Sequence, residues 1–274
     1  MHTLEKKIST LYAVPWFDCN LTCPHCNVRK ATSEFDIDKF KEVLSTVDAE
    51  HVVLFGGEPT LVWAHFVSIL ETGKVDSVST NMVVYPNTFI RNSFVDLCKK
   101  YNLSIATSWN KTRFNDIQFL QWLGNLKELT SANIDVTVLI TLTQDLLAGP
   151  LSDVLHVLGK MERVGIKKFL YEPCIGSGEC NNLADKWLCK FHDEYKGNMT
   201  NLLEEKLGSW FCNCDDVYTL LPTGELRKGC PDSFEVEKQF CNDCLNCGKV
   251  DKCRPCVLQK TCSYPKKLAE KLGI

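Results

Sequence analysis

The stretch Cys19-Asn-Leu-Thr-Cys23-Pro-His-Cys26 places three thiols at a C-x3-C-x2-C spacing, directly after the first predicted strand of the chain. Three thiolates can hold a four-iron, four-sulfur cluster and leave one iron open to a substrate or cofactor. A closed structural metal site has no such open position. The spacing therefore predicts an open cluster site, and the alternative is a zinc site completed by His25 or by a distant cysteine.

Short apolar or β-branched runs recur from residue 11 to residue 171, and each is followed by a helical pattern. Alternation at a spacing of ~30 residues predicts an α/β fold with parallel strands, in the form of a partial (β/α)6 TIM-like barrel. Right-handed crossovers bring the carboxyl ends of all these strands to one face. We expect strands at residues 11–16, 52–55, 75–80, 103–108, 134–140 and 168–171.

Helical stripes support this architecture. Asp36 is a candidate N-cap for a helix whose apolar residues share one face. Cys98 lies on the apolar stripe of a later helix, so we expect it to pack in the core and not to ligate a metal. A last helix over about residues 183–207 completes a first domain of residues 1–208.

Composition restricts the class of protein. Hydrophobic residues make up 45% of the 274 residues, and the net charge of −3 comes from well-mixed acidic and basic residues, as in a globular protein without overall attraction to nucleic acid. Neither an export signal nor an apolar run of ~18 residues is found, so we expect a cytoplasmic protein without a membrane partner. The sixteen cysteines then favour metal ligation over disulfides.

A second motif, Gly56-Gly57-Glu58-Pro59, follows the second predicted strand. Two glycines let a ligand approach the backbone, whose amides and carbonyls can bind its polar ends. Glu58 offers a carboxylate to a cationic amine. Alone, the motif is also compatible with a simple turn, and its position beside the cysteine loop favours a binding site.

The remainder of the chain, residues 209–274, is a cysteine-rich region that we interpret as a small iron-sulfur domain. Its C-x2-C pairs lie closer together than the roughly 15 to 20 residues of a zinc ribbon, which favours iron-sulfur ligation. Cys174 and Cys180, after the sixth strand, are either substrate-site or cluster residues or unligated thiols. The candidate ligands in the tail are Cys212, Cys214, Cys230, Cys241, Cys244, Cys247, Cys253, Cys256 and Cys262.

The two strand-end motifs and the alternation over residues 11–175 resemble the radical S-adenosylmethionine superfamily. Its members carry C-x3-C-x2-C after the first strand and a GGE-type motif after the second. The resemblance implies that Cys19, Cys23 and Cys26 ligate a [4Fe-4S] cluster whose open iron binds the amine and carboxylate of S-adenosylmethionine. It also implies cofactor contacts by the strand-end residues Gly56, Gly57, Glu58, Pro59, Thr80, Asn81, Ser108 and Asn110.

Ser108-Trp-Asn110 resembles the Ser-x-Asp that contacts the ribose in this superfamily, with Asn110 where Asp is commoner. The implied chemistry is reductive cleavage of S-adenosylmethionine to methionine and a 5′-deoxyadenosyl radical, which takes a hydrogen atom from an unactivated C–H bond. An external electron donor such as flavodoxin or ferredoxin is implied as a partner.

The tail resembles the SPASM/Twitch extension of such enzymes, which implies one or two auxiliary [4Fe-4S] clusters. Two spacings depart from that pattern: Cys253 to Cys256 is one residue short, and Gly224 to Cys230 is one residue long. The resemblance divides the ligands into an outer set, Cys244, Cys247, Cys253 and Cys262, and an inner set, Cys214, Cys230 and Cys256, completed by Cys212 or Cys241.

Three functions are compatible with these motifs. The favoured one is a radical enzyme, an oxidoreductase or crosslinking enzyme, that modifies a peptide or protein side chain. The same chemistry on a nucleobase, a modified DNA base or another small molecule, for example by an isomerase, is the second. The third is a non-catalytic iron-sulfur or zinc-binding electron-transfer module, which requires residues 56–59 to be an idle turn.

Overall fold

A computed structural model of the chain describes residues 8–23, 26, 35–83, 88–173, 187, 190–191, 194–195 and 217–228. Their strands form one sheet with the order β6-β5-β4-β3-β2-β1-β7-β8. All neighbouring pairs are parallel except β7 and β8. The α/β fold with a mostly parallel sheet is therefore confirmed, whereas the partial barrel stays a prediction.

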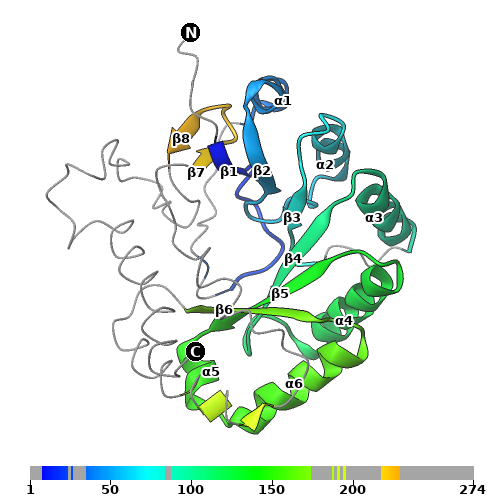
Figure 1. Cartoon of the computed structure of the whole chain (residues 1–274), viewed down its shortest axis with the longest axis vertical. Helices are drawn as coiled ribbons and strands as arrows, with labels where there is room; N and C mark the ends of the chain where they lie inside the picture. The colour runs from blue at the N-terminus through cyan, green and yellow to red at the C-terminus, as the bar shows by residue number, and fades with distance from the viewer. Residues whose placement is uncertain are drawn as a thin grey trace, which may run out of the picture.

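The six predicted strands are all present, some with shifted ends. They are β1 Ile8–Ala13, β2 Ala49–Leu54, β3 Ser77–Ser79, β4 Ser104–Trp109, β5 Val136–Leu142 and β6 Lys168–Pro173. The connecting helices are α1 Ile37–Thr46, α2 Trp63–Leu70, α3 Thr88–Lys100, α4 Asp116–Ser131, α5 Gln144–Ala148 and α6 Leu151–Arg163. In Figure 1 these helices lie along one outer side of the sheet.

The two faces of the sheet differ in burial. One row of paired residues, running from β1 to β5, is buried on the side of the helices. The adjacent row, displaced by one residue, is only half-buried, because successive side chains of a strand point to opposite faces. The buried row is Ala13, Leu54, Val78, Ile105 and Val136, and the half-buried row is Tyr12, Val53, Ser77 and Ser104.

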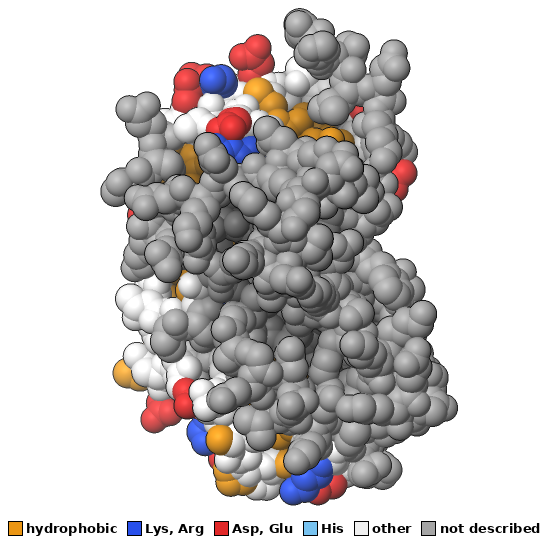
Figure 2. All heavy atoms as spheres, turned by 90° about the vertical axis from the view of Figure 1, so that its left-hand side faces the viewer, with side chains coloured by type: hydrophobic (Ala, Val, Ile, Leu, Met, Phe, Trp, Pro, Cys, Tyr) orange, Lys and Arg blue, Asp and Glu red, His pale blue; other side chains and the backbone are white. Residues whose placement is uncertain are grey.

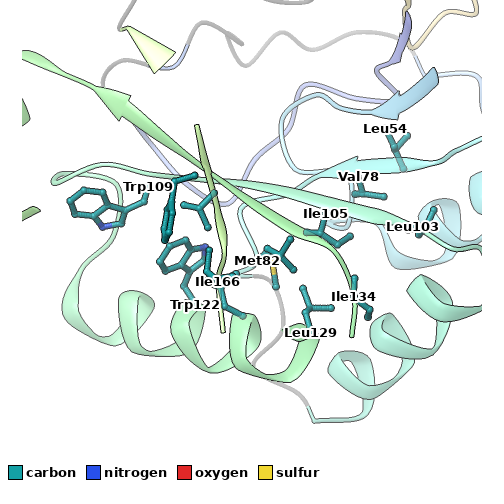
Figure 3. Close-up of a cluster of buried hydrophobic side chains, with 14 of the residues drawn as sticks. Leu54, Val78, Met82, Leu103, Ile105, Trp109, Trp122, Leu129, Ile134 and Ile166 are labelled. Atoms are coloured by element: carbon teal, nitrogen blue, oxygen red, sulfur yellow. The ribbon is translucent and has the colours of Figure 1, made fainter. Parts of the chain in front are cut away.

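The core lies between the sheet and the helices. Figure 3 shows Val78 and Ile105 of adjacent strands together with Trp122 and Leu129 of α4. Trp122 is fully buried, and its indole Nε1 donates a hydrogen bond to Thr107 Oγ1 at 3.0 Å. The polar end of this large side chain is thus satisfied where it meets the sheet.

Two predictions about the helices are confirmed. Asp36 caps α1, because its Oδ1 accepts a hydrogen bond from the Lys39 N–H at 3.0 Å. Cys98 of α3 is 1% exposed within the apolar core. Burial raises the pKa of its thiol to about 12, as expected for a packing residue.

A hairpin that was not predicted from the sequence, β7 Val217–Leu220 and β8 Leu226–Lys228, lies within the range assigned to the cysteine-rich region. β7 pairs in parallel with β1, so β1 is an interior strand. Gly224 closes the hairpin with a φ of +77°, which favours glycine. The dense cysteines on both sides hid the short strand pattern, and the division into residues 1–208 and 209–274 stays a prediction.

The helix predicted over residues 183–207 lies mostly outside the described residues. Trp187, Lys190, Phe191 and Glu194 are described, and they are helical. The rings of Trp187 and Phe191 stack with their centroids 5.1 Å apart, and both side chains are buried in the core. In the described parts of the chain, no helix is long and apolar enough to cross a membrane.

Candidate functional site

The loop that carries the cysteines is attached to the loop after β2 by hydrogen bonds. The backbone N–H of Gly57 donates to the Trp16 carbonyl at 3.1 Å, and that of Glu58 donates to the Asp18 carbonyl at 2.8 Å. The Trp16 indole Nε1 donates to the Glu58 carbonyl at 2.6 Å. The two sequence motifs therefore form one unit at the carboxyl ends of β1 and β2.

The glycines of the second motif are required by this attachment. Gly56 has a φ of +136°, and a Cβ there would lie 2.5 Å from the Trp16 oxygen. A Cβ on Gly57 would lie 2.1 Å from the Asp18 oxygen. The approach of a ligand to both glycines, expected from the sequence, stays a prediction. The structure shows that the backbone of the cysteine loop itself takes up this space.

Glu58 is fully buried at the centre of the strand ends. Its Oε1 accepts hydrogen bonds from the Thr60 N–H at 3.1 Å and from the hydroxyls of Thr60 and Thr80. Its Oε2 accepts from the Asn81 N–H at 2.6 Å. Burial raises the pKa of this carboxyl, opposed by these hydrogen bonds. Glu58 thus joins the end of β2 to the end of β3, and its contact with an amine stays a prediction.

Asn81 connects this carboxylate to the first cysteine. Its side-chain Nδ2 lies 3.6 Å from Cys19 Sγ and 2.7 Å from Asn20 Oδ1. The N–H of Leu21 also donates to Cys19 Sγ, at 3.4 Å. Burial raises the pKa of the Cys19 thiol, opposed first by the Leu21 N–H. The structure therefore brings Cys19, Glu58 and Asn81, predicted separately from the sequence, into one hydrogen-bonded group.

The other two cysteines lie at a tight turn in the same loop. The Cys26 N–H donates to the Cys23 carbonyl at 3.1 Å. Cys19 and Cys23 are partly buried, whereas Cys26 is exposed. Among the described residues, no three His, Cys, Asp or Glu side chains lie close enough together to hold a single metal ion. A cluster takes its thiolates on separate irons, so three thiols on one loop with nearby N–H donors fit such a group.

Ser108 and Asn110, both predicted at the end of β4, lie in different surroundings. Ser108 shares a register row with Leu139 and Leu170, on the half-buried side of the sheet. Asn110 is 1% exposed, and its Oδ1 accepts from the Thr112 N–H at 3.1 Å. Asn110 also lines a cavity of about 270 Å³, whose other walls come from Trp109 and Phe114 and from α4, α5 and α6. No residue of the Cys19, Glu58 and Asn81 group lines this cavity.

Four residues that contact the two motifs or act on Cys19 were not predicted from the sequence. Trp16, Asn20 and Thr60 make the hydrogen bonds described above. Asn20 lies within the first motif and the other two lie close to a motif, which was the only indication in the sequence. Burial raises the pKa of the Cys19 thiol, and the positive charge of Arg113, in the loop after β4, is the smallest of the effects that oppose this rise. Its guanidinium carbon lies 5.5 Å from the centre of the Phe114 ring. Nothing in the sequence around Arg113 marked it.

The remaining candidate ligands, from Cys174 and Cys180 through Cys212 to Cys262, lie outside the described residues, and their roles stay predictions. Figure 2 shows one face of the molecule, on which the visible described acidic and basic side chains are interspersed. This agrees with the mixed charge of the sequence.

The fold of the chain is similar to that of several solved structures. No family model and no curated protein matches the chain. The solved structure of SuiB from Streptococcus suis bound to S-adenosylmethionine is 13% identical, with a TM-score of 0.59 over 84% of this chain and 62% of that chain. The structure of native anSMEcpe with bound AdoMet is 14% identical, with a TM-score of 0.60 over 96% of this chain and 97% of that chain.

A third structure is coproporphyrinogen III oxidase (HemN) from Escherichia coli, described as a radical SAM enzyme. It is 9% identical, with a TM-score of 0.51 over 79% of this chain and 63% of that chain. The chain thus spans less than two thirds of the length of SuiB and of HemN. At these identities, the likeness establishes a shared fold.

Proposed function

We propose that the chain is a radical S-adenosylmethionine enzyme whose [4Fe-4S] cluster is held by Cys19, Cys23 and Cys26. The observation that carries this proposal is the attachment of the cysteine loop to residues 56–58 through the bonds of Gly57 and Glu58. The shared fold with structures that hold S-adenosylmethionine supports it. An idle turn at residues 56–59 would not need two glycines packed against the cysteine loop.

A cluster held by these thiols would supply one electron for the reductive cleavage of S-adenosylmethionine. The residues of the chain would hold the cluster and orient the cofactor. The cysteine loop keeps its thiols at the carboxyl ends of the strands, and the Glu58 carboxylate fixes the ends of β2 and β3. The strand-end residues Thr80, Asn81, Ser108 and Asn110 are proposed to line the cofactor.

The finer architecture we propose is a partial (β/α)6 barrel. Its support is the order of β1 to β6, in which each strand lies beside the next along the chain. Right-handed crossovers then place the helices on one side, as Figure 1 shows, and leave the other face for a substrate. The half-buried row of Tyr12, Val53, Ser77 and Ser104 lies on that face.

The proposed substrate is a peptide or protein side chain. Its support is the structure of SuiB bound to the precursor peptide SuiA, which matches 85% of this chain with a TM-score of 0.59. The tail of residues 209–274 is proposed to hold one or two auxiliary clusters, and a flavodoxin or ferredoxin is proposed to supply electrons. A small-molecule substrate is the second candidate, because the name of HemN is that of an oxidase of coproporphyrinogen III.

The test is formation of 5′-deoxyadenosine. The full chain is reconstituted anaerobically with iron and sulfide, reduced with dithionite and mixed with S-adenosylmethionine, and the product is measured by mass spectrometry. We expect product from the wild type and from Cys98→Ala, whose thiol lies in the core. We expect none from the Cys19→Ala, Cys23→Ala, Cys26→Ala triple variant. A wild type with full iron and sulfide that forms no 5′-deoxyadenosine overturns the proposal.

A further inference from the structure

The side chain of Asn81 is held in one orientation by its three partners. Its Oδ1 accepts a hydrogen bond from the Val83 N–H at 2.9 Å. Its Nδ2 faces Asn20 Oδ1 at 2.7 Å and Cys19 Sγ at 3.6 Å. Rotating the amide by 180° would place two oxygens against each other and two N–H groups against each other. The N–H groups of Asn81 must therefore point to the cysteine loop.

The backbone of the same residue is held as well. The Asn81 N–H donates to Glu58 Oε2 at 2.6 Å, and the side chain is 2% exposed. A chain of hydrogen bonds thus runs from the buried carboxylate of the second motif, through Asn81, to the sulfur of the first motif. Substitution of the Asn81 side chain leaves its backbone bond to Glu58 in place, so the contact with the sulfur can be removed separately.

Hydrogen bonds to cysteine sulfurs change the reduction potential of an iron-sulfur cluster. A reduced cluster carries one more negative charge, part of which lies on its sulfurs, so an N–H donor stabilises the reduced state more than the oxidised state. Cys19 receives two such donors, the Leu21 N–H and Asn81 Nδ2. The second is the only one of the two that a side-chain substitution can remove.

We propose that Asn81 is a positioning residue that fixes Cys19 in the loop and raises the reduction potential of the cluster that Cys19 holds. This inference rests on the proposed function, because it takes Cys19 as a cluster ligand. It gives Asn81 a role distinct from the cofactor contact predicted from the sequence. Because Glu58 holds the backbone of Asn81, the carboxylate that joins β2 to β3 would also influence reduction of the cluster.

The test is a potentiometric titration of the reconstituted full chain, followed by electron paramagnetic resonance without S-adenosylmethionine. Asn81→Leu removes the donor, whereas Asn81→Asp keeps the acceptor for the Val83 N–H and replaces the donor with a charged oxygen. The spectrum of the Cys19→Ala, Cys23→Ala, Cys26→Ala variant is subtracted from each spectrum, so that only the cluster held by these three cysteines is followed. At a fixed ambient potential, we expect the ratio of reduced to oxidised cluster to fall about tenfold in Asn81→Leu, and further in Asn81→Asp.

Thr60→Val is the matched control. It removes a hydroxyl donor from the same Glu58 carboxylate, and the hydrogen bonds of Thr60 described above go to Glu58 and not to Cys19. We expect its titration to match that of the wild type. Loss of the cluster from both Asn81 variants, with the cluster retained in Thr60→Val, supports the positioning role.

The outcomes separate the inference from the proposed function. If both Asn81 variants hold a full cluster that titrates as in the wild type, the inference is wrong and the proposed function stands. If the wild type assembles no cluster that depends on the three cysteines, the proposed function itself fails.

Discussion

The sheet is buried in two different ways. On the side of the helices, Leu54, Val78 and Ile105 pack against apolar side chains. At the carboxyl ends of the strands, Glu58 and Asn81 are buried as deeply, but they are polar and held by hydrogen bonds. Apolar burial stabilises the fold by about 25 cal/mol per Å². A buried carboxylate contributes little net stability, because its desolvation offsets its hydrogen bonds.

The two regions therefore have different roles in the molecule. The helix-covered face supplies the stability of the fold, whereas the strand ends hold the cysteine loop in position. Substitutions in the first region should therefore change the free energy of unfolding most. Substitutions in the second should change cluster retention more than their effect on stability alone would predict.

The largest effect is expected from Trp122→Ala in α4. The side chain is fully buried, so its removal should lower the free energy of unfolding by about 3–5 kcal/mol. Ile117→Ala, on the same helix but 70% exposed, is the control and should change it by less than about 0.5 kcal/mol. Urea denaturation followed by circular dichroism measures both. Equal effects of the two substitutions would contradict this division of the molecule.

Glu58→Gln tests the polar region. Both carboxylate oxygens accept hydrogen bonds, so an amide NH2 at either position faces a donor. Leaving a buried donor unsatisfied should lower the free energy of unfolding by about 1–3 kcal/mol. We expect the reconstituted variant to retain less iron than Thr60→Val, which loses only one of the donors. Full iron retention with unchanged stability would show that Glu58 does not position the loop.

Two glycine substitutions, one at the contact between the loops and one in α4, compare the same two regions. A Cβ on Gly57 would lie 2.1 Å from the Asp18 oxygen, so Gly57→Ala should lower the free energy of unfolding by about 1–3 kcal/mol and impair cluster assembly. At Gly124, within α4, a Cβ would meet nothing within 4 Å. Gly124→Ala should instead raise the free energy of unfolding by about 0.5–1 kcal/mol. If Gly57→Ala changes neither thermal unfolding nor cluster assembly, the close packing of the two loops is not required.

The smallest effect concerns Cys98 and pH. Because burial raises the pKa of its thiol to about 12, the folded state disfavours the thiolate. The contribution of this thiol to the free energy of unfolding is fully present below its ordinary pKa of about 9. It is lost as the pH rises from there toward 12. At neutral pH, iodoacetamide should modify the exposed Cys26 well before Cys98, as measured by mass spectrometry of the apo protein. Equal rates of modification would show that α3 opens readily.

Local patterns were sufficient to predict part of this structure. The six strands, the cap at Asp36 and the burial of Cys98 depend on periodicity and on residues a few positions apart. The contact of Asn81 with Cys19 joins residues 62 positions apart. It depends on the register of β1, β2 and β3, which no short window of sequence encodes.

The same reason explains why the sequence did not predict the strand β7 or the contact between the two loops. β7 was missed because four residues of strand pattern lie among cysteines, and only their pairing with β1 reveals the strand. The glycines at residues 56 and 57 also pack closely against the backbone of residues 16–18, and their contact with a ligand stays a prediction. The close approach of two loops becomes visible only when both strands are placed in the sheet.

The most direct test of the central claim compares the iron and sulfide content and the electron paramagnetic resonance spectrum of the reconstituted wild type with those of the Cys19→Ala, Cys23→Ala, Cys26→Ala variant. The account predicts that the variant loses the iron, the sulfide and the signal of one [4Fe-4S] cluster, and keeps any cluster held elsewhere in the chain. Unchanged iron, sulfide and spectrum in the variant would contradict it.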